Sequence, residues 1–217
     1  MSQVLKLVCL AKSWKHQGYC IAGKTADGSW VRTVTSNANN NAIFNQANGV
    51  EPLDVFEVEV LGHSPSAHQT ENYLINERKM FNAVSSLGID DIDDLELVDT
   101  PEDLWGTGES SRYGLNDKID LDKQEEPSNS LLLIQPDDTI FVIMQNEYDK
   151  EKIRIKFTYN GDDYCLTTTD LSIQDYYRDP ENKLYEGEEE EIEARYLSIS
   201  LAEPLNNSLY KVVAGVF

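Results

Sequence analysis

Short segments with β-strand patterning, separated by turn residues, recur along most of this 217-residue chain. The clearest is LDVFEVEVL at residues 53–61, where apolar and acidic residues alternate as they do in a strand with one buried face. Asp27-Gly28 and Asn160-Gly161 each separate two such segments, and both dipeptides are strong hairpin-turn signals. The pattern therefore predicts a mainly β protein with a few short helices.

The N-terminal region predicts a small antiparallel sheet. Residues 4–11, 19–22, 30–35 and 53–61 read as strands, and the Asn-rich residues 37–48 read as a loop. Met80, Phe81, Val84 and Leu87 recur at helical spacing, which predicts an amphipathic helix over residues 77–87. Residues 89–104 read as an acidic connector, with a short helix beginning at Thr100.

A second strand-rich region begins at residue 131. Four β-patterned segments, LLLIQ, TIFVIMQ, KIRIKFTYN and DYCLTTT, are followed by strands expected at residues 196–201 and 210–217. The acidic run EGEEEE at residues 186–191 is expected to be a disordered loop. Each region has the strand content of a small barrel, so we expect two small β-barrels packed side by side, in domains 1–125 and 126–217.

The distribution of charge divides the chain at a different place from the two strand-rich regions. The first 36 residues hold five basic residues against one acidic residue, whereas the remainder holds 13 Lys and Arg against 38 Asp and Glu, and the net charge is −21. A pI near 4.3 argues against a protein that coats duplex DNA, because phosphate neutralisation supplies most non-specific affinity. Any contact with nucleic acid is therefore expected to be local and to use the basic N-terminal block.

Several classes of site are absent from the sequence. It has no apolar run of membrane-spanning length and no signal-peptide pattern, so we expect a soluble, cytoplasmic protein. The three cysteines are widely spaced without a CxxC pair, which predicts buried apolar thiols and neither disulfides nor a zinc site. No P-loop, GxSxG or HExxH motif occurs, and the three histidines lack metal-ligand spacing. No cofactor or metal is expected.

The basic block contains the first candidate site. Trp30 and Arg32 share one face of a predicted strand, and Lys12, Ser13 and Lys15 are expected in the loop before its neighbour. An indole beside a guanidinium, with ammonium groups nearby, can stack a base and hold a phosphate. The alternative is structural: Trp30 fills the barrel core and Arg32 covers its ring or pairs with an internal carboxylate.

Two polar loops form the second candidate. HQTENYLI at residues 68–75 and LWGTGESSRYGLNDKI at residues 104–119 are rich in hydrogen-bonding side chains. Loops of this composition usually hold capping and turn residues, but they are also where ligands bind. An enzyme remains a third possibility, in which Asp117 with Lys118, or Asp170, would supply acid and base groups.

Five blocks of the chain follow one another in order: LVCLAKSWKHQGYCIAGK…GSWVRTVTS, the two polar loops above, SLLLIQPDD and the closing YLSISLAEPLNNSLYKVVAGVF. They resemble, in the same order, the blocks of a prokaryotic family described as a dual OB-containing domain. The chain departs from the family pattern at Lys12, where the family has Asn, and at Thr33, where it has Pro. The resemblance implies two OB barrels, which commonly bind single strands or nucleotides, and an association with mobile elements and bacterial defence. The matching polar positions are Ser13, Lys15, Trp30, Arg32, Asn72, Ser111, Asn116, Asp117, Lys118 and Lys211.

Two hypotheses for function follow. The first is a non-enzymatic binding module that engages a nucleotide or a short single strand through Lys12, Lys15, Trp30 and Arg32. The second is an acidic interaction protein that imitates nucleic acid and binds a basic partner protein through residues 90–96 and 186–191. The sequence does not determine the oligomeric state.

Overall fold

The computed structural model describes residues 2–15, 18–36, 46–47 and 49–217, which divide into two compact units. Unit 1 comprises Met1–Val98 with Ser128–Ser130, and unit 2 comprises Asp99–Pro127 with Leu131–Phe217. The division falls near residue 99 and not at the expected boundary after residue 125. The reason is that the expected connector contains a strand, Lys118–Asp120, which pairs with the last strand of the chain.

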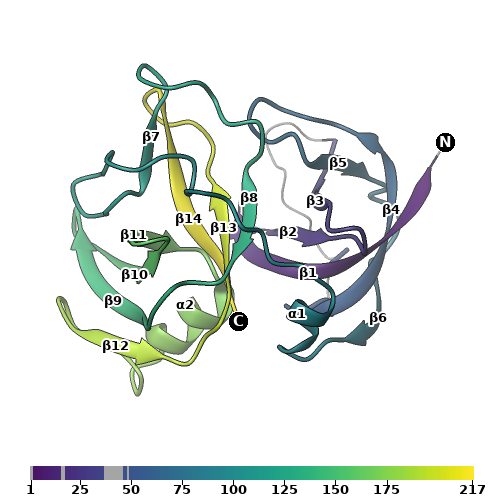
Figure 1. The fold of residues 1–217 in the computed structure, drawn as a ribbon. Helices are drawn as coiled ribbons and strands as arrows, with labels where there is room; N and C mark the ends of the chain where they lie inside the picture. Colours follow the sequence, from purple (N-terminus) through teal and green to yellow (C-terminus); the bar gives the residue numbers. More distant parts are fainter. Residues whose placement is uncertain (1, 16–17, 37–45, 48) are drawn as a thin grey trace. The chain divides into compact units, whose positions relative to one another are not determined.

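Unit 1 is a closed five-stranded barrel in the order β1-β2-β3-β5-β4, with β4 pairing back to β1 (Figure 1). β3 and β5 are parallel and the other neighbours in the barrel are antiparallel, which is the strand order of an OB-fold. A sixth strand, β6, extends the sheet beside β4. The elements are β1 Gln3–Lys15, β2 Gly18–Lys24, β3 Trp30–Val34, β4 Asp54–His63, β5 Asn72–Ile75, β6 Asn82–Ser86 and the one-turn helix α1 Asp91–Asp94.

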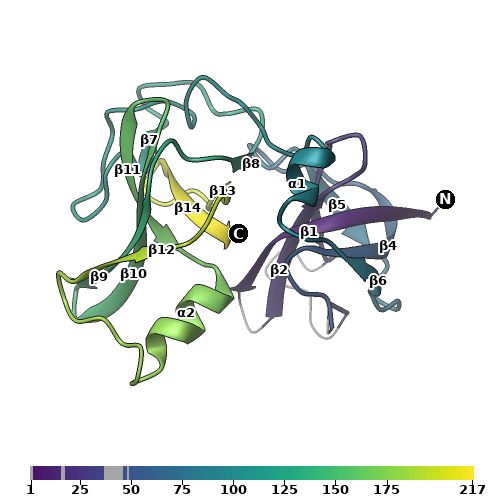
Figure 2. The same ribbon diagram turned by 60° about the horizontal axis from the view of Figure 1, so that its bottom comes forward.

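In unit 2 the strands β9-β10-β11-β14-β13 follow the same order as β1-β2-β3-β5-β4 in unit 1. β11 and β14, which correspond to β3 and β5, are again parallel. Its sheet is extended at the two ends by β12 and β8, while β7 pairs with β14. Helix α2 packs Ile173 and Tyr177 onto the core and lies beside β9 and β12 in both views (Figures 1 and 2). The elements are β7 Lys118–Asp120, β8 Leu131–Ile134, β9 Ile140–Glu147, β10 Lys150–Tyr159, β11 Asp162–Thr168, α2 Leu171–Arg178, β12 Glu189–Ile192, β13 Leu197–Leu201 and β14 Ser208–Val216.

The mainly β, dual-barrel fold class is thus confirmed, as are both predicted hairpins, β2–β3 and β10–β11. Each unit has its own apolar core, with Leu7, Ile21 and Phe56 in unit 1 and Ile155, Phe157 and Leu166 in unit 2. Cys9 and Cys165 are buried and Cys20 is half-buried, and burial raises the pKa of the Cys9 thiol to about 12. The expected loop at residues 37–48 lies mostly outside the described residues.

Three predictions about secondary structure were wrong. Residues 77–87 form a turn and strand β6, not a helix, because Phe81 stacks on Phe56 while Met80 and Val84 are exposed. The helix expected from Thr100 is absent from the described residues there, and the connector's helix is instead α1. The acidic run at residues 186–191 is not wholly a loop, because its second half enters β12 and pairs with β9 through backbone groups.

No helix within the described ranges combines the length and apolarity that spanning a membrane requires. The residues that the structure describes likewise hold no group of three or more His, Cys, Asp or Glu arranged to bind a metal ion.

Gly23 fixes the close approach of β1 and β2, and its replacement tests the barrel directly. A Cβ at this position would lie 2.0 Å from the carbonyl oxygen of Val8, which is backbone and has no free space to move. We expect Gly23→Ala to lower the free energy of unfolding by about 1–3 kcal/mol in urea unfolding followed by tryptophan fluorescence. Gly88→Ala is the control, because its nearest neighbour lies at 3.5 Å. Equal stability of the two variants would contradict the described packing.

Candidate nucleic-acid interface

Two of the basic residues expected to form the N-terminal site, Lys12 and Arg32, are paired with carboxylates of unit 1. Lys12 is buried on β1, donates to Glu51 Oε1 at 2.8 Å, and lies 4.7 Å from the centre of the Tyr19 ring. Ser13 and Lys15 also lie on β1, opposite Cys20 and Gly18, and not in the expected loop. The side chain of Lys15 is outside the described part of the chain.

Arg32 is also buried, on β3. Its Nη2 donates to Ser130 Oγ at 2.9 Å and lies 3.4 Å from Glu71 Oε1, and Ser130 in turn bonds to Glu71. The side chains of Arg32 and Glu71 are each only 7% exposed. Asn72, the register partner of Arg32 on β5, is also buried and donates to Gln69. This arrangement fits the structural alternative for Arg32, in which it pairs with an internal carboxylate.

The outward face of β2 and β3 is covered by other segments of unit 1. Ile21 and Val31 point into the core, so Lys24, Trp30 and Arg32 lie on the opposite face by strand alternation. Lys24 lies 5.3 Å from the Trp30 ring centre and donates to the carbonyl of Leu97 at 2.7 Å. Because Ser130 caps Arg32 on the same face, the surface that OB folds commonly use for ligands is occupied here by the chain itself.

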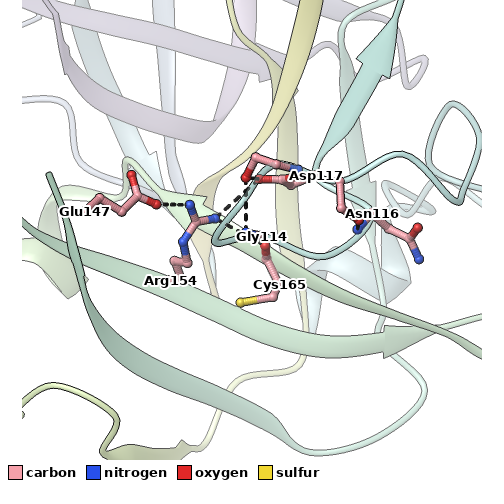
Figure 3. Close-up of polar contacts among 8 residues, drawn as sticks. Gly114, Asn116, Asp117, Glu147, Arg154 and Cys165 are labelled. Carbon is pink, nitrogen blue, oxygen red and sulfur yellow. Dashed lines mark hydrogen bonds and ion pairs between the residues drawn. The ribbon is translucent and has the colours of Figure 1, made fainter.

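In unit 2, the loop residues expected to form a site do come together, around Asp117 (Figure 3). The Asp117 carboxylate accepts 2.6 Å hydrogen bonds from the backbone N and the Oγ of Ser111, and it lies 3.4 Å from Arg154 Nη1. Gly114 is required for this contact, because a Cβ there would lie 1.9 Å from Asp117 Oδ2. Asn116 fixes the loop from the other side by donating to the carbonyl of Asp163 at 2.9 Å.

Lys211 and Lys118 lie near the same loop but have separate partners. The Lys211 ammonium donates to the carbonyl of Gly106 at 2.5 Å and lies 5.5 Å from the Tyr164 ring centre. Burial lowers the pKa of Lys211 to about 8, against the opposing effect of nearby aspartates. Lys118 is within 4.0 Å of Asp120. Asp170 caps α2 by accepting from the backbone N of Ile173.

Arg154 belongs to a row of cations that the sequence reasoning missed. Ile153, Ile155 and Phe157 point into the core of unit 2, so the alternate residues Lys150, Lys152, Arg154 and Lys156 share the outward face of β10. The sequence signal for this row is the alternation of basic and apolar residues in KEKIRIKF. We call these four residues the β10 basic row.

The members of the β10 basic row differ in their partners. Arg154 is buried and pairs with Asp117 and Glu147, as Figure 3 shows. Lys156 lies 3.5 Å from Glu189 across exposed surface, where an ion pair is weak. Lys152 is half-buried and forms no ion pair with any residue that the structure describes. The row therefore offers Lys150 and Lys152 as its available charges, beside the β9–β10 hairpin.

The tip of that hairpin carries an exposed aromatic residue in an unusual conformation. Tyr148 and Asp149 form the two-residue turn, with φ values of 49° and 63°, and Tyr148 is 75% exposed. Asn or Gly is the usual choice at such positions, as at Asn160-Gly161, because a bulky side chain there costs free energy. The Tyr113 ring lies 5.9 Å from that of Tyr148, edge to face, and the Arg112 guanidinium is 5.2 Å from Tyr113.

Comparison with known proteins gives one family. A family model described as "Dual OB-containing domain" matches residues 5–216, nearly the whole chain. No curated protein sequence matches.

Among solved structures, a murine DNA-binding protein bound to double-stranded DNA shares 9% identity at a TM-score of 0.34, covering 99% of this chain and 96% of that one. The HINa domain of Ifi202 in complex with a 20 bp double-stranded DNA shares 10% identity at a TM-score of 0.32, covering 97% of this chain and 90% of that one. A structure described as "Structural mimicry for functional antagonism" shares 10% identity at a TM-score of 0.33, covering 97% and 87%.

The buried pair of Arg32 and Glu71 leads to a stability prediction. Arg32→Ala leaves the Glu71 carboxylate buried without its cation, so we expect the free energy of unfolding to fall by about 3–5 kcal/mol in urea unfolding. Arg78→Ala, which removes an exposed arginine of the same unit, should change it by less than about 0.5 kcal/mol.

Replacing both partners separates the charge effect from simple loss of packing. The double variant Arg32→Met with Glu71→Leu should recover most of the lost stability, because no unpaired charge remains buried. If Arg32→Ala were as stable as Arg78→Ala, the structural role of Arg32 would be contradicted.

Proposed function

Because this chain belongs to the family of dual OB-containing domains, we propose that it binds a short single-stranded nucleic acid, and that it does so through unit 2. The observation that supports this most is the β10 basic row ending beside the Tyr148 hairpin tip. OB folds commonly bind oligonucleotides on the second and third strands and on the loop between the first two. In unit 2 these elements are β10, β11 and the β9–β10 hairpin, by the strand order given above.

The chemistry of this surface suits a backbone and its bases. Lys150 and Lys152 supply ammonium groups spaced along one strand, which can follow successive phosphates. Tyr148 and Tyr113 supply ring faces, and stacking of a base on an aromatic ring contributes about 1–3 kcal/mol. A bulky residue held at a positive φ is a local cost to folding, which supports a role for Tyr148 in binding.

A single strand suits this surface better than a duplex. Only a few of the chain's 18 basic residues lie on it, and the rest of the molecule carries most of its 39 acidic residues. Duplex binding without sequence preference relies on many phosphate contacts, whereas single strands add stacking to fewer charges. This proposal moves the site away from Trp30 and from Lys12 and Arg32, whose charges are balanced within unit 1 by Glu51 and Glu71.

The contributions of base stacking and of positive charge can be tested separately by fluorescence anisotropy with labelled DNA and RNA oligonucleotides at low salt. Tyr148→Ala should weaken binding about tenfold, whereas Tyr148→Phe, which keeps the ring, should bind like the wild type. Lys152→Ala should weaken binding of every sequence and reduce the slope of log K against log salt by about 0.7. Lys79→Ala, an exposed lysine of unit 1, serves as the control and should change neither quantity.

Two results would overturn the proposal. One is wild-type binding weaker than about 100 μM for every oligonucleotide, and the other is equal loss in Lys152→Ala and Lys79→Ala. The first result, combined with salt-sensitive binding to a basic protein, would favour the alternative in which the acidic surface imitates nucleic acid. The expected defence or mobile-element setting stays a prediction.

A further inference from the structure

A pocket of about 290 Å³ lies in unit 2 between helix α2 and the strands that carry the proposed interface. Its walls come from β9, β10, the end of β11 and α2, with Lys183 from the segment after the helix. Its volume is near the lower end of the range for small-molecule sites, so it suits a group no larger than a mononucleotide. Tyr177 and Met144 form part of its apolar base, since both belong to the core of unit 2.

The lining of the pocket is basic in a strongly acidic protein. Lys152, Arg178 and Lys183 contribute three positive charges, against a single carboxylate from Glu151. Glu151 is engaged by Lys183 at 2.6 Å, and Arg178 lies 3.9 Å from Asp175. Lys152 forms no ion pair with any described residue, so two cations remain in excess over the carboxylate in the lining.

Neutral donors complete the lining. Consecutive threonines at the end of β11 face the pocket with Gln174, whose amide donates to the carbonyl of Thr168 at 2.8 Å and is thereby held in place. The hydroxyls of Thr168 and Thr169 are directed to the carbonyl of Val213, whereas no described residue accepts from Thr167. The ammonium and guanidinium groups that are in excess, together with the Thr167 hydroxyl, can donate hydrogen bonds to the oxygens of a doubly charged phosphate group.

We propose that this pocket binds a phosphate monoester, either the terminal phosphate of the strand or a mononucleotide. The inference rests on the proposed function, because Lys152 belongs both to the pocket and to the β10 basic row. A strand whose backbone follows that row would place its terminal phosphate at the pocket. A terminal phosphate carries more charge than an internal phosphodiester, so this site would favour strand ends.

The test compares oligonucleotides that carry a 5′ phosphate, a 3′ phosphate or no terminal phosphate, with AMP and inorganic phosphate titrated separately by calorimetry. We expect one phosphorylated end to bind about tenfold more tightly than the unphosphorylated strand. In Arg178→Gln that preference should fall below about threefold. In Tyr148→Ala all oligonucleotides should weaken together and the preference should remain. Arg178 is exposed, so its replacement should leave the fold intact, and Lys79→Gln is the matched control.

The outcomes separate the two proposals. Equal binding of all three oligonucleotides would overturn the pocket assignment and leave the interface standing. Absence of oligonucleotide binding, with AMP or phosphate binding that Arg178→Gln abolishes, would overturn the interface and support a free phosphate monoester as ligand. Absence of binding by every probe would overturn both.

Discussion

On the outward face of each unit, a buried arginine paired with a carboxylate holds the neighbouring segments in place. In unit 1, Arg32 pairs with Glu71 and is capped by Ser130; in unit 2, Arg154 pairs with Asp117 and Glu147. Taking such charges out of water is costly unless they are paired and hydrogen-bonded, so the pairs fix the segments that carry their partners. Each pair thereby determines how much of the outward face of its sheet is covered by other segments.

The two units use the same arrangement with different results. In unit 1, the basic residues of β2 and β3 find partners in Glu71, Ser130 and the carbonyl of Leu97, and their face is covered. In unit 2, the loop around Asp117 covers Arg154, while Lys150 and Lys152 continue along β10 toward the exposed Tyr148. A charge cluster in a sequence is thus only the starting point, because its internal partners determine what a ligand can reach.

The sequence predicted the fold class, but it did not reveal the partners of the candidate site residues. Hairpins at Asp27-Gly28 and Asn160-Gly161 were predictable because turn chemistry is local. The prediction of a helix at residues 77–87 was wrong, because the spacing of Phe81 reflects its stacking on Phe56, which is distant in the sequence. Strand β12 was missed because pairing with β9 uses backbone groups and tolerates a row of glutamates. The partner of Arg32 could not be inferred, since Glu71 and Ser130 meet it only through the fold.

Photo-crosslinking tests whether unit 2, and not the basic N-terminal block, binds nucleic acid. A single strand carrying 4-thiothymidine at each position in turn would be irradiated with the full chain, and the modified peptides identified by mass spectrometry. We expect crosslinks to Tyr148 and Tyr113, whose rings lie together at the hairpin. Crosslinks confined to peptides containing Lys12 or Trp30 would contradict binding through unit 2.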